Sequence, residues 1–95
     1  MADMSKQTSI SAFGSHLTQL DKAVLTYIGT NPGCTQGDIF NVFRSQRIER
    51  LIAVTSKLDS IGLIFEDGYI KNRWGQEKPA LYARQGWKQF ATEEY

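Results

Sequence analysis

The chain has 95 residues, enough for one domain and hardly more, and 41% of them are hydrophobic. Cys34 is the only cysteine, which excludes an intrachain disulfide and a metal site built on paired cysteines. No apolar run approaches the roughly 18 residues of a membrane span, and Met1–Thr8 lacks the hydrophobic stretch of a signal peptide. We therefore expect a cytoplasmic protein with no membrane partner.

The formal net charge is only +1, but the charges are unevenly distributed along the chain. The segments Arg44–Lys57 and Lys71–Arg84 together hold eight basic and two acidic residues, a net charge of +6. The remaining residues are three basic and eight acidic, a net charge of −5. Such a split can create one surface that attracts a polyanion on a nearly neutral chain. The other interpretation is two solvated loops that happen to be basic.

Residues 1–14 show no clear periodicity, so we expect a flexible tail or arm ahead of one domain over residues 15–95. A first helix is predicted over Gln19–Thr30, because apolar residues recur there every three to four positions. Thr18 and Asp21 have the spacing of a capping pair at its start.

A second helix is predicted over Gln36–Phe43, after the stop signal Asn31–Gly33. Thr35 and Asp38 again have the spacing of a capping pair. Its expected buried side consists of Ile39, Val42 and Phe43. Cys34, just before the cap, is expected to be buried as a small apolar residue, with a redox-sensing thiol as the minority interpretation.

A third helix is predicted over Gln46–Ser60, and it is amphipathic at 100° per residue. One side is largely apolar and consists of Ile48, Leu51, Val54, Thr55 and Leu58. The other side is polar and net basic, and it consists of Gln46, Glu49, Arg50, Ala53, Ser56 and Lys57. Ala53 lies in the middle of the polar side and is small enough to permit the close approach of a partner.

The pattern after Gly62 is typical of an antiparallel hairpin. Leu63–Phe65 and Tyr69–Ile70 are predicted as strand with a turn or bulge between them, and Ala80–Ala83 as the returning strand. Asn72–Pro79 is predicted as a long basic loop, and Gly86–Tyr95 as a short closing helix. The predicted fold class is α+β, with three helices, a hairpin and a terminal helix.

Over Leu17–Phe90 the sequence resembles the winged helix-turn-helix regulators of the MarR, PadR and ArsR type. The residues that carry the resemblance are Thr35–Ile39, Leu58–Ile64 and Gln76–Tyr82. The chain departs from the family pattern at Ala83-Arg84, where Leu-Thr is common, and at Glu77–Pro79, where Gly-Arg-Pro is common. We therefore assign the superfamily and no subfamily.

The resemblance implies that the third helix, residues 46–60, enters the major groove of double-stranded DNA. The base-reading candidates are Gln46, Glu49, Arg50 and Ala53. Arg50 suits guanine and Gln46 suits adenine. Glu49 either accepts from cytosine or pairs with a neighbouring arginine, and we favour the pairing.

The same resemblance implies contacts with the DNA backbone. The candidates outside the wing are Thr35, Gln36, Arg44, Arg47, Ser56 and Lys57. In the wing, residues 70–80, they are Lys71, Arg73, Trp74 and Lys78, on the backbone or in the minor groove. Thr35 and Gln36 can equally be a plain helix cap. Trp74 can stack on a sugar or pack back against the hairpin.

The leading hypothesis is a small transcriptional repressor that binds DNA as a homodimer, since one helix reads too few base pairs alone. The alternative is a winged helix that binds another protein within a transcription or replication assembly, and the many aromatic residues favour it. No catalytic signature, metal-ligand set or nucleotide-binding glycine motif is present, so we expect neither an enzyme nor a cofactor. Nothing in the sequence predicts a small-molecule effector.

Overall fold

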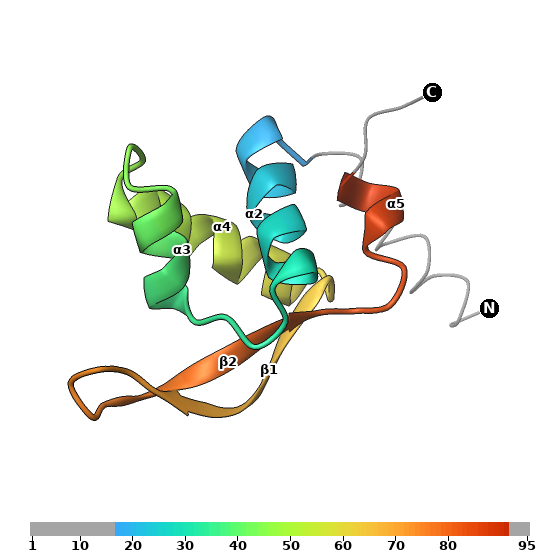
Figure 1. Cartoon of the computed structure of the whole chain (residues 1–95). Coiled ribbons are helices and arrows are strands. Elements are labelled where there is room, and N and C mark those ends of the chain that lie inside the picture. The colour runs from blue at the N-terminus through green and yellow to red at the C-terminus, as the bar shows by residue number, and fades with distance from the viewer. Residues whose placement is uncertain (1–16, 92–95) are drawn as a thin grey trace.

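The computed structural model describes residues 17–91, which form a helical body and a projecting hairpin (Figure 1). The elements in chain order are α2 (Gln19–Thr30), α3 (Gln36–Val42), α4 (Ile48–Ser60), β1 (Ile64–Lys71), β2 (Glu77–Ala83) and α5 (Lys88–Ala91). This order confirms the predicted α+β winged helix architecture. The predicted tail over residues 1–14 lies outside the described residues. No described helix is long and apolar enough to cross a membrane.

Capping boxes set the starts of α2 and α3. The hydroxyl of Thr18 accepts from the amide of Asp21 at 3.1 Å, and the Asp21 carboxylate accepts from the Thr18 amide at 2.9 Å. Thr35 and Asp38 form the same reciprocal pair, with distances of 3.3 and 3.0 Å. Both helices therefore start at the residues predicted from the cap spacing, because each box satisfies two amides that a helix start leaves unpaired.

α4 starts at Ile48, two residues later than predicted. The amide of Gln46 donates to the carbonyl of Phe43 at 2.8 Å, which holds Gln46 in the turn between α3 and α4. Arg47 is the N-cap and makes no side-chain capping bond. Gln46 therefore lies half-buried in the turn before α4 and not on the helix as predicted, and its base-reading role stays a prediction.

Two apolar residues that were expected in the core face solvent instead. Ile48 is 53% exposed and Val42 is 52% exposed, whereas Leu51, Val54, Thr55 and Leu58 are buried as predicted. Ile48 and Val42 flank the turn between α3 and α4, where the two helices end or begin. An apolar periodicity identifies the buried side of a helix but not how far along it the covering elements reach.

The hairpin is longer and its loop shorter than predicted. β2 begins at Glu77, and the pairs Ile70–Lys78 and Lys71–Glu77 continue the ladder to the loop. Pro79, the last residue of the predicted loop, lies within β2 although it has no amide hydrogen to donate. It lies opposite Tyr69, at the bulge between Glu66 and Tyr69 where the ladder is already interrupted.

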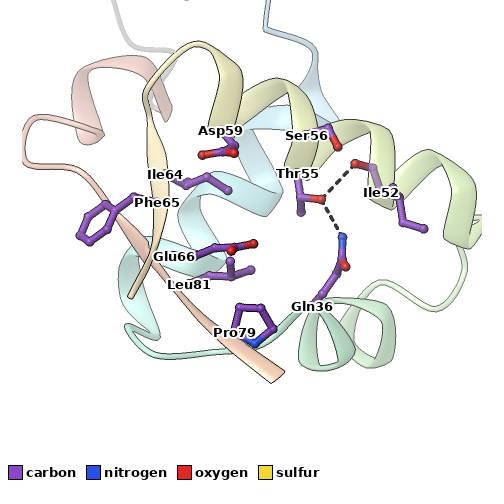
Figure 2. Close-up of a pocket in the computed structure, with 10 residues that line it drawn as sticks. All are labelled: Gln36, Ile52, Thr55, Ser56, Asp59, Ile64, Phe65, Glu66, Pro79 and Leu81. Carbon is purple, nitrogen blue, oxygen red and sulfur yellow. Dashed lines mark hydrogen bonds between the residues drawn. The ribbon is translucent and has the colours of Figure 1, made fainter. Parts of the chain in front are cut away.

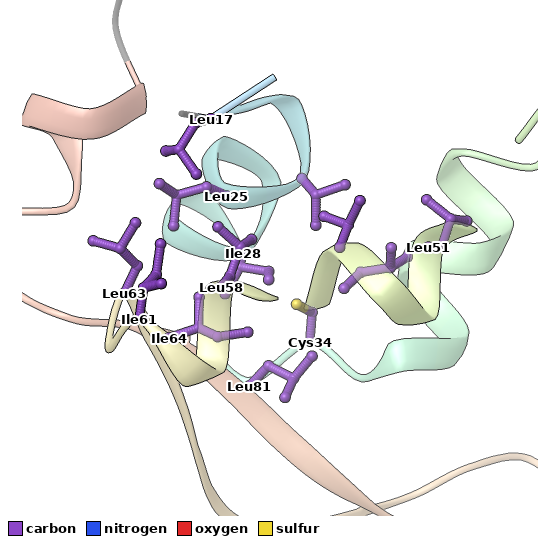
Figure 3. Packing of buried hydrophobic residues seen from close by; sticks show 13 residues of the cluster. Leu17, Leu25, Ile28, Cys34, Leu51, Leu58, Ile61, Leu63, Ile64 and Leu81 are labelled. Atoms are coloured by element: carbon purple, nitrogen blue, oxygen red, sulfur yellow. The ribbon is translucent and has the colours of Figure 1, made fainter. Parts of the chain in front are cut away.

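One buried cluster joins the three helices to the base of the hairpin (Figure 3). Its fully enclosed side chains are Val24, Leu25, Ile28, Ile39, Leu51, Leu58 and Ile64. Cys34 is buried among them, as predicted, and its backbone pairs with that of Leu81 in an isolated β-bridge. The hairpin is thereby anchored to the helical body by side chains and by backbone.

α5 closes the body through one close contact with α2. The indole of Trp87 lies where the β-carbon of any larger residue at Gly29 would be. Trp87 and Phe90 pack against the core as partly buried side chains. α5 is described over Lys88–Ala91, and the rest of the predicted helix lies outside the described residues.

Gly29→Ala is expected to lower the free energy of unfolding by about 1–3 kcal/mol, because the added methyl overlaps the Trp87 ring. Helix propensity alone favours alanine, so propensity and packing predict opposite signs. The matched control is Gly37→Ala in α3, where a β-carbon would lie 3.6 Å from the Thr35 hydroxyl. It should be neutral or stabilising by up to about 1 kcal/mol. Urea unfolding followed by circular dichroism compares the two, and equal effects would contradict the Trp87 contact.

Burial, and to a smaller extent the nearby Asp38 carboxylate, raise the pKa of the Cys34 thiol to about 11. Against the ordinary value of 9.0, the folded protein then holds about one hundredth of the thiolate of the unfolded chain at neutral pH. Alkylation should therefore be slow in native protein and fast in urea. The folded state keeps the proton that the unfolded state loses, so stability should fall as the pH rises from about 9 to about 11. Equal alkylation rates in both states would refute this.

Candidate nucleic-acid interface

Three arginines lie at or beside the turn between α3 and α4. Arg44 and Arg47 are in the turn, and Arg50 is in the first turn of α4; all three are exposed. Since α4 follows immediately, the arginines surround the end of the helix that the sequence predicts to enter a DNA groove. The structure thus groups the basic residues of the first basic segment at one end of α4, with the exception of Lys57.

The outward face of α4 carries little charge of its own. Glu49, Arg50, Ala53 and Ser56 are all exposed, as predicted for the polar side of this helix. Glu49 has no ion pair with an arginine within residues 17–91, so the favoured pairing interpretation is not what the structure shows. Its carboxylate remains available as a hydrogen-bond acceptor.

The wing presents its basic side chains to solvent. Lys71, Arg73 and Lys78 are exposed around a loop that Asn72 organises by accepting from the amides of Trp74 and Gln76, both at 2.9 Å. The Arg73 guanidinium lies over the Trp74 ring, 5.2 Å from its centroid. Trp74 stays 74% exposed, so it does not pack back into the hairpin.

A cleft separates the start of α3 from the wing, and we call it the basic cleft. Its charged lining residues are four basic, Arg44, Lys71, Arg73 and Lys78, and one acidic, Asp38. Trp74 and Phe40 also line it. Residues far apart in the sequence therefore combine into one concave surface of positive charge, which focuses an attractive field on an anion. Figure 1 shows the hairpin extending past α3 on this side.

A second pocket, of about 250 Å³, lies between α4 and the base of the hairpin (Figure 2). Its walls include Ile52, Ile64 and Leu81, and its carboxylates are those of Asp59 and Glu66. None of the described residues that line it is basic. This pocket is therefore unsuited to a phosphate, and the structure separates an anion-attracting cleft from an acidic pocket.

Thr35 and Gln36 have structural partners. Thr35 belongs to the capping box of α3, and the side-chain amide of Gln36 donates to the Thr55 hydroxyl at 2.8 Å (Figure 2). The Thr55 hydroxyl donates in turn to the carbonyl of Ile52 at 3.0 Å. The helix-cap interpretation therefore holds for Thr35, whereas Gln36 ties α3 to α4 through a tertiary hydrogen bond.

Lys57 turns towards α2 rather than outward. Its ammonium lies 2.7 Å from the carboxylate of Asp21, a residue that is 3% exposed. The same carboxylate accepts a hydrogen bond from the amide of Thr18 at the start of α2. Sequence periodicity placed Lys57 on the polar side of the helix but could not show this partner, which is 36 residues away. The pair leaves Lys57 less free to reach a phosphate than the arginines.

Lys57→Met keeps the length of the side chain and removes its charge, leaving the Asp21 carboxylate buried without its cation. Breaking a fully buried pair costs about 3–5 kcal/mol; we expect about 1–3 kcal/mol here, because the Lys57 side chain is 35% exposed. The control Lys71→Met, on the exposed wing, should change stability by less than about 0.5 kcal/mol. Urea unfolding measures both. An unchanged stability for Lys57→Met would show that the pair contributes nothing to the fold.

Comparisons with known proteins identify the fold. No protein-family model matches the chain, and no curated protein matches it by sequence. Among solved structures, it is similar to the transcriptional regulator SlyA, with a TM-score of 0.63 and 19% identity. The match covers 95% of this chain and 61% of the SlyA chain, so this chain spans less than two thirds of that regulator's length. The likeness shows that the protein has a winged helix-turn-helix fold.

Proposed function

We propose that this protein is a transcriptional regulator that binds double-stranded DNA with α4 in the major groove and the wing on the backbone or in the minor groove. The observation that carries the proposal is the basic cleft, together with the arginines around the start of α4. The chain is nearly neutral, and its positive charge lies mainly around α4 and on the wing, the two elements expected to contact DNA in this fold. The likeness to a transcriptional regulator supports the same function.

The exposed residues divide into two proposed roles. Arg44, Arg47, Lys71, Arg73 and Lys78 contact phosphates, and Trp74 stacks on a sugar or base beside the wing. Glu49, Arg50 and Ala53 face base edges, with Arg50 donating to guanine, and Ser56 lies at the margin of this set. The side chains of Thr35, Gln36 and Lys57 instead stabilise the fold, since each has a partner within the protein.

We further propose that the protein acts as a homodimeric repressor. A single α4 spans too few base pairs for useful specificity, and two copies on neighbouring half-sites would double the sequence that is read. Occupying a promoter needs no catalytic or effector domain. Elution volume and light scattering with and without operator DNA would test the dimer separately from DNA binding.

A second candidate function is supported by one specific observation. Val42, Ile48 and Ile52 are exposed on the helix-turn-helix, and Tyr69 and Ile70 are exposed on the hairpin. Exposed apolar side chains on the face that would otherwise bind DNA are compatible with a protein partner. The arginines interspersed with them favour the polyanion, because the centre of a protein interface is depleted of charge.

Fluorescence anisotropy with the DNA upstream of the protein's own gene and a scrambled duplex, across a salt series, tests the proposal. We expect tighter binding to the upstream DNA than to the scrambled duplex. The affinity should fall steeply as the salt concentration rises, because DNA releases condensed counterions when the protein contacts its phosphates. Lys78→Ala should weaken both duplexes and reduce the salt slope by about 1. Arg50→Ala should cost about 1–3 kcal/mol and relax the preference at one base pair.

The matched control is Arg84→Ala, which removes the same charge at the opposite end of the hairpin, where Arg84 lies over Phe65. It should leave the salt slope unchanged. No binding to any duplex at low salt would rule out the DNA function, and a search for a protein partner would follow.

A further inference from the structure

The loop of the wing holds one aromatic ring out into solvent. Trp74 is 74% exposed, more than any other large hydrophobic residue that the structure describes. Asn72 fixes the shape of the loop, because its side-chain oxygen accepts from the amides of Trp74 and Gln76, and its own amide donates to the carbonyl of Gln76 at 2.8 Å. The Arg73 guanidinium covers one face of the indole, 5.2 Å from the ring centroid. The opposite face is therefore open to a flat ligand.

The surroundings of Trp74 indicate the chemistry of that ligand. Trp74 lines the basic cleft, and α3 supplies a second aromatic residue, the partly buried Phe40. The single acidic residue of the cleft, Asp38, is used within the fold, since its carboxylate accepts from the Thr35 amide at 3.0 Å. Basic side chains around an exposed aromatic ring are the combination that binds single-stranded nucleic acid, because the cations attract the phosphates and the bases stack on the ring.

An intact duplex does not offer Trp74 the face of a base. Each base within a duplex is stacked between its neighbours, so a side chain outside the helix reaches only sugars, phosphates and base edges. Taking a base out of the stack costs at least about as much as one stacking contact contributes. A base that is already unpaired carries no such cost. The open face of the indole therefore favours an unpaired strand over a paired one.

We propose that the basic cleft binds an unpaired strand of DNA that continues from the duplex on α4, with one base stacked on Trp74. Lys71, Arg73 and Lys78 line the same cleft and would contact the phosphates of that strand. The inference rests on the proposed function, because the duplex on α4 brings the strand to the wing. The partner that this surface fits is a junction between duplex and single-stranded DNA. A protein partner is disfavoured, since the centre of a protein interface is depleted of charge.

The test compares two tails on a duplex that the full chain binds, with fluorescence anisotropy as the readout. One tail has about four unpaired nucleotides, and the other has the same length and phosphates but lacks the bases. The duplex is shortened until further trimming weakens binding, and the tail is placed at each strand end in turn, so that one tail begins beside the wing. At that end, we expect the tail with bases to bind about fivefold to a hundredfold more tightly than the abasic tail, the range for one stacked base.

Variants then assign the difference between the tails to its side chain. Trp74→Ala should abolish the difference, and Trp74→Phe should keep part of it, because a smaller ring still stacks on a base. The matched control is Tyr69→Ala, since Tyr69 is 69% exposed on the hairpin but does not line the basic cleft. It should leave the difference intact. Lys78→Ala should weaken both tails by the same factor, because the lost cation acts on phosphates that both tails contain.

The outcomes separate this inference from the proposed function. A duplex that binds equally well with either tail, at every strand end, leaves the function standing and overturns the inference. A difference between the tails that persists in Trp74→Ala also overturns it, since another residue then stacks on the base. If no duplex is bound with or without a tail, the proposed function fails and the inference fails with it.

Discussion

The backbone pairing between the segment before α3 and the middle of β2 places the two halves of the candidate interface. The amide of Gly33 donates to the carbonyl of Leu81 at 2.9 Å, and the amide of Leu81 donates to the carbonyl of Cys34 at 2.7 Å. Thr35 follows at once as the cap of α3, so the same two bonds fix the start of α3 beside the hairpin. The basic cleft exists because this pairing holds the wing next to that helix start.

Pairing within the fold then decides which basic side chains are available to a ligand. Lys57 is held by Asp21, which joins α4 to the capped start of α2. Arg44, Arg47 and Arg50 stay exposed around the first turn of α4. The net charge of the chain conceals this division, because it sums charges that lie on different surfaces; of the described acidic residues, Asp38 alone lines the basic cleft. Attraction of a polyanion is thus a property of one surface rather than of the whole molecule.

The proposed functions of this surface separate affinity from specificity. Phosphate contacts by the arginines and the wing would supply most of the affinity and all of its salt dependence, without reading sequence. Specificity would come from the outward face of α4, with Arg50 at guanine.

The sequence by itself determined the features that depend on neighbouring residues. The capping boxes and the amphipathic period predicted the bounds of α2, the start of α3 and most of the buried side of α4, because each signal lies within a turn or two of its effect. Only the tertiary structure decided what distant residues do: it exposed Ile48, paired Lys57 with Asp21 and carried β2 past Pro79 to the loop. These depend on which element covers which, and a local pattern in the chain contains no information about that.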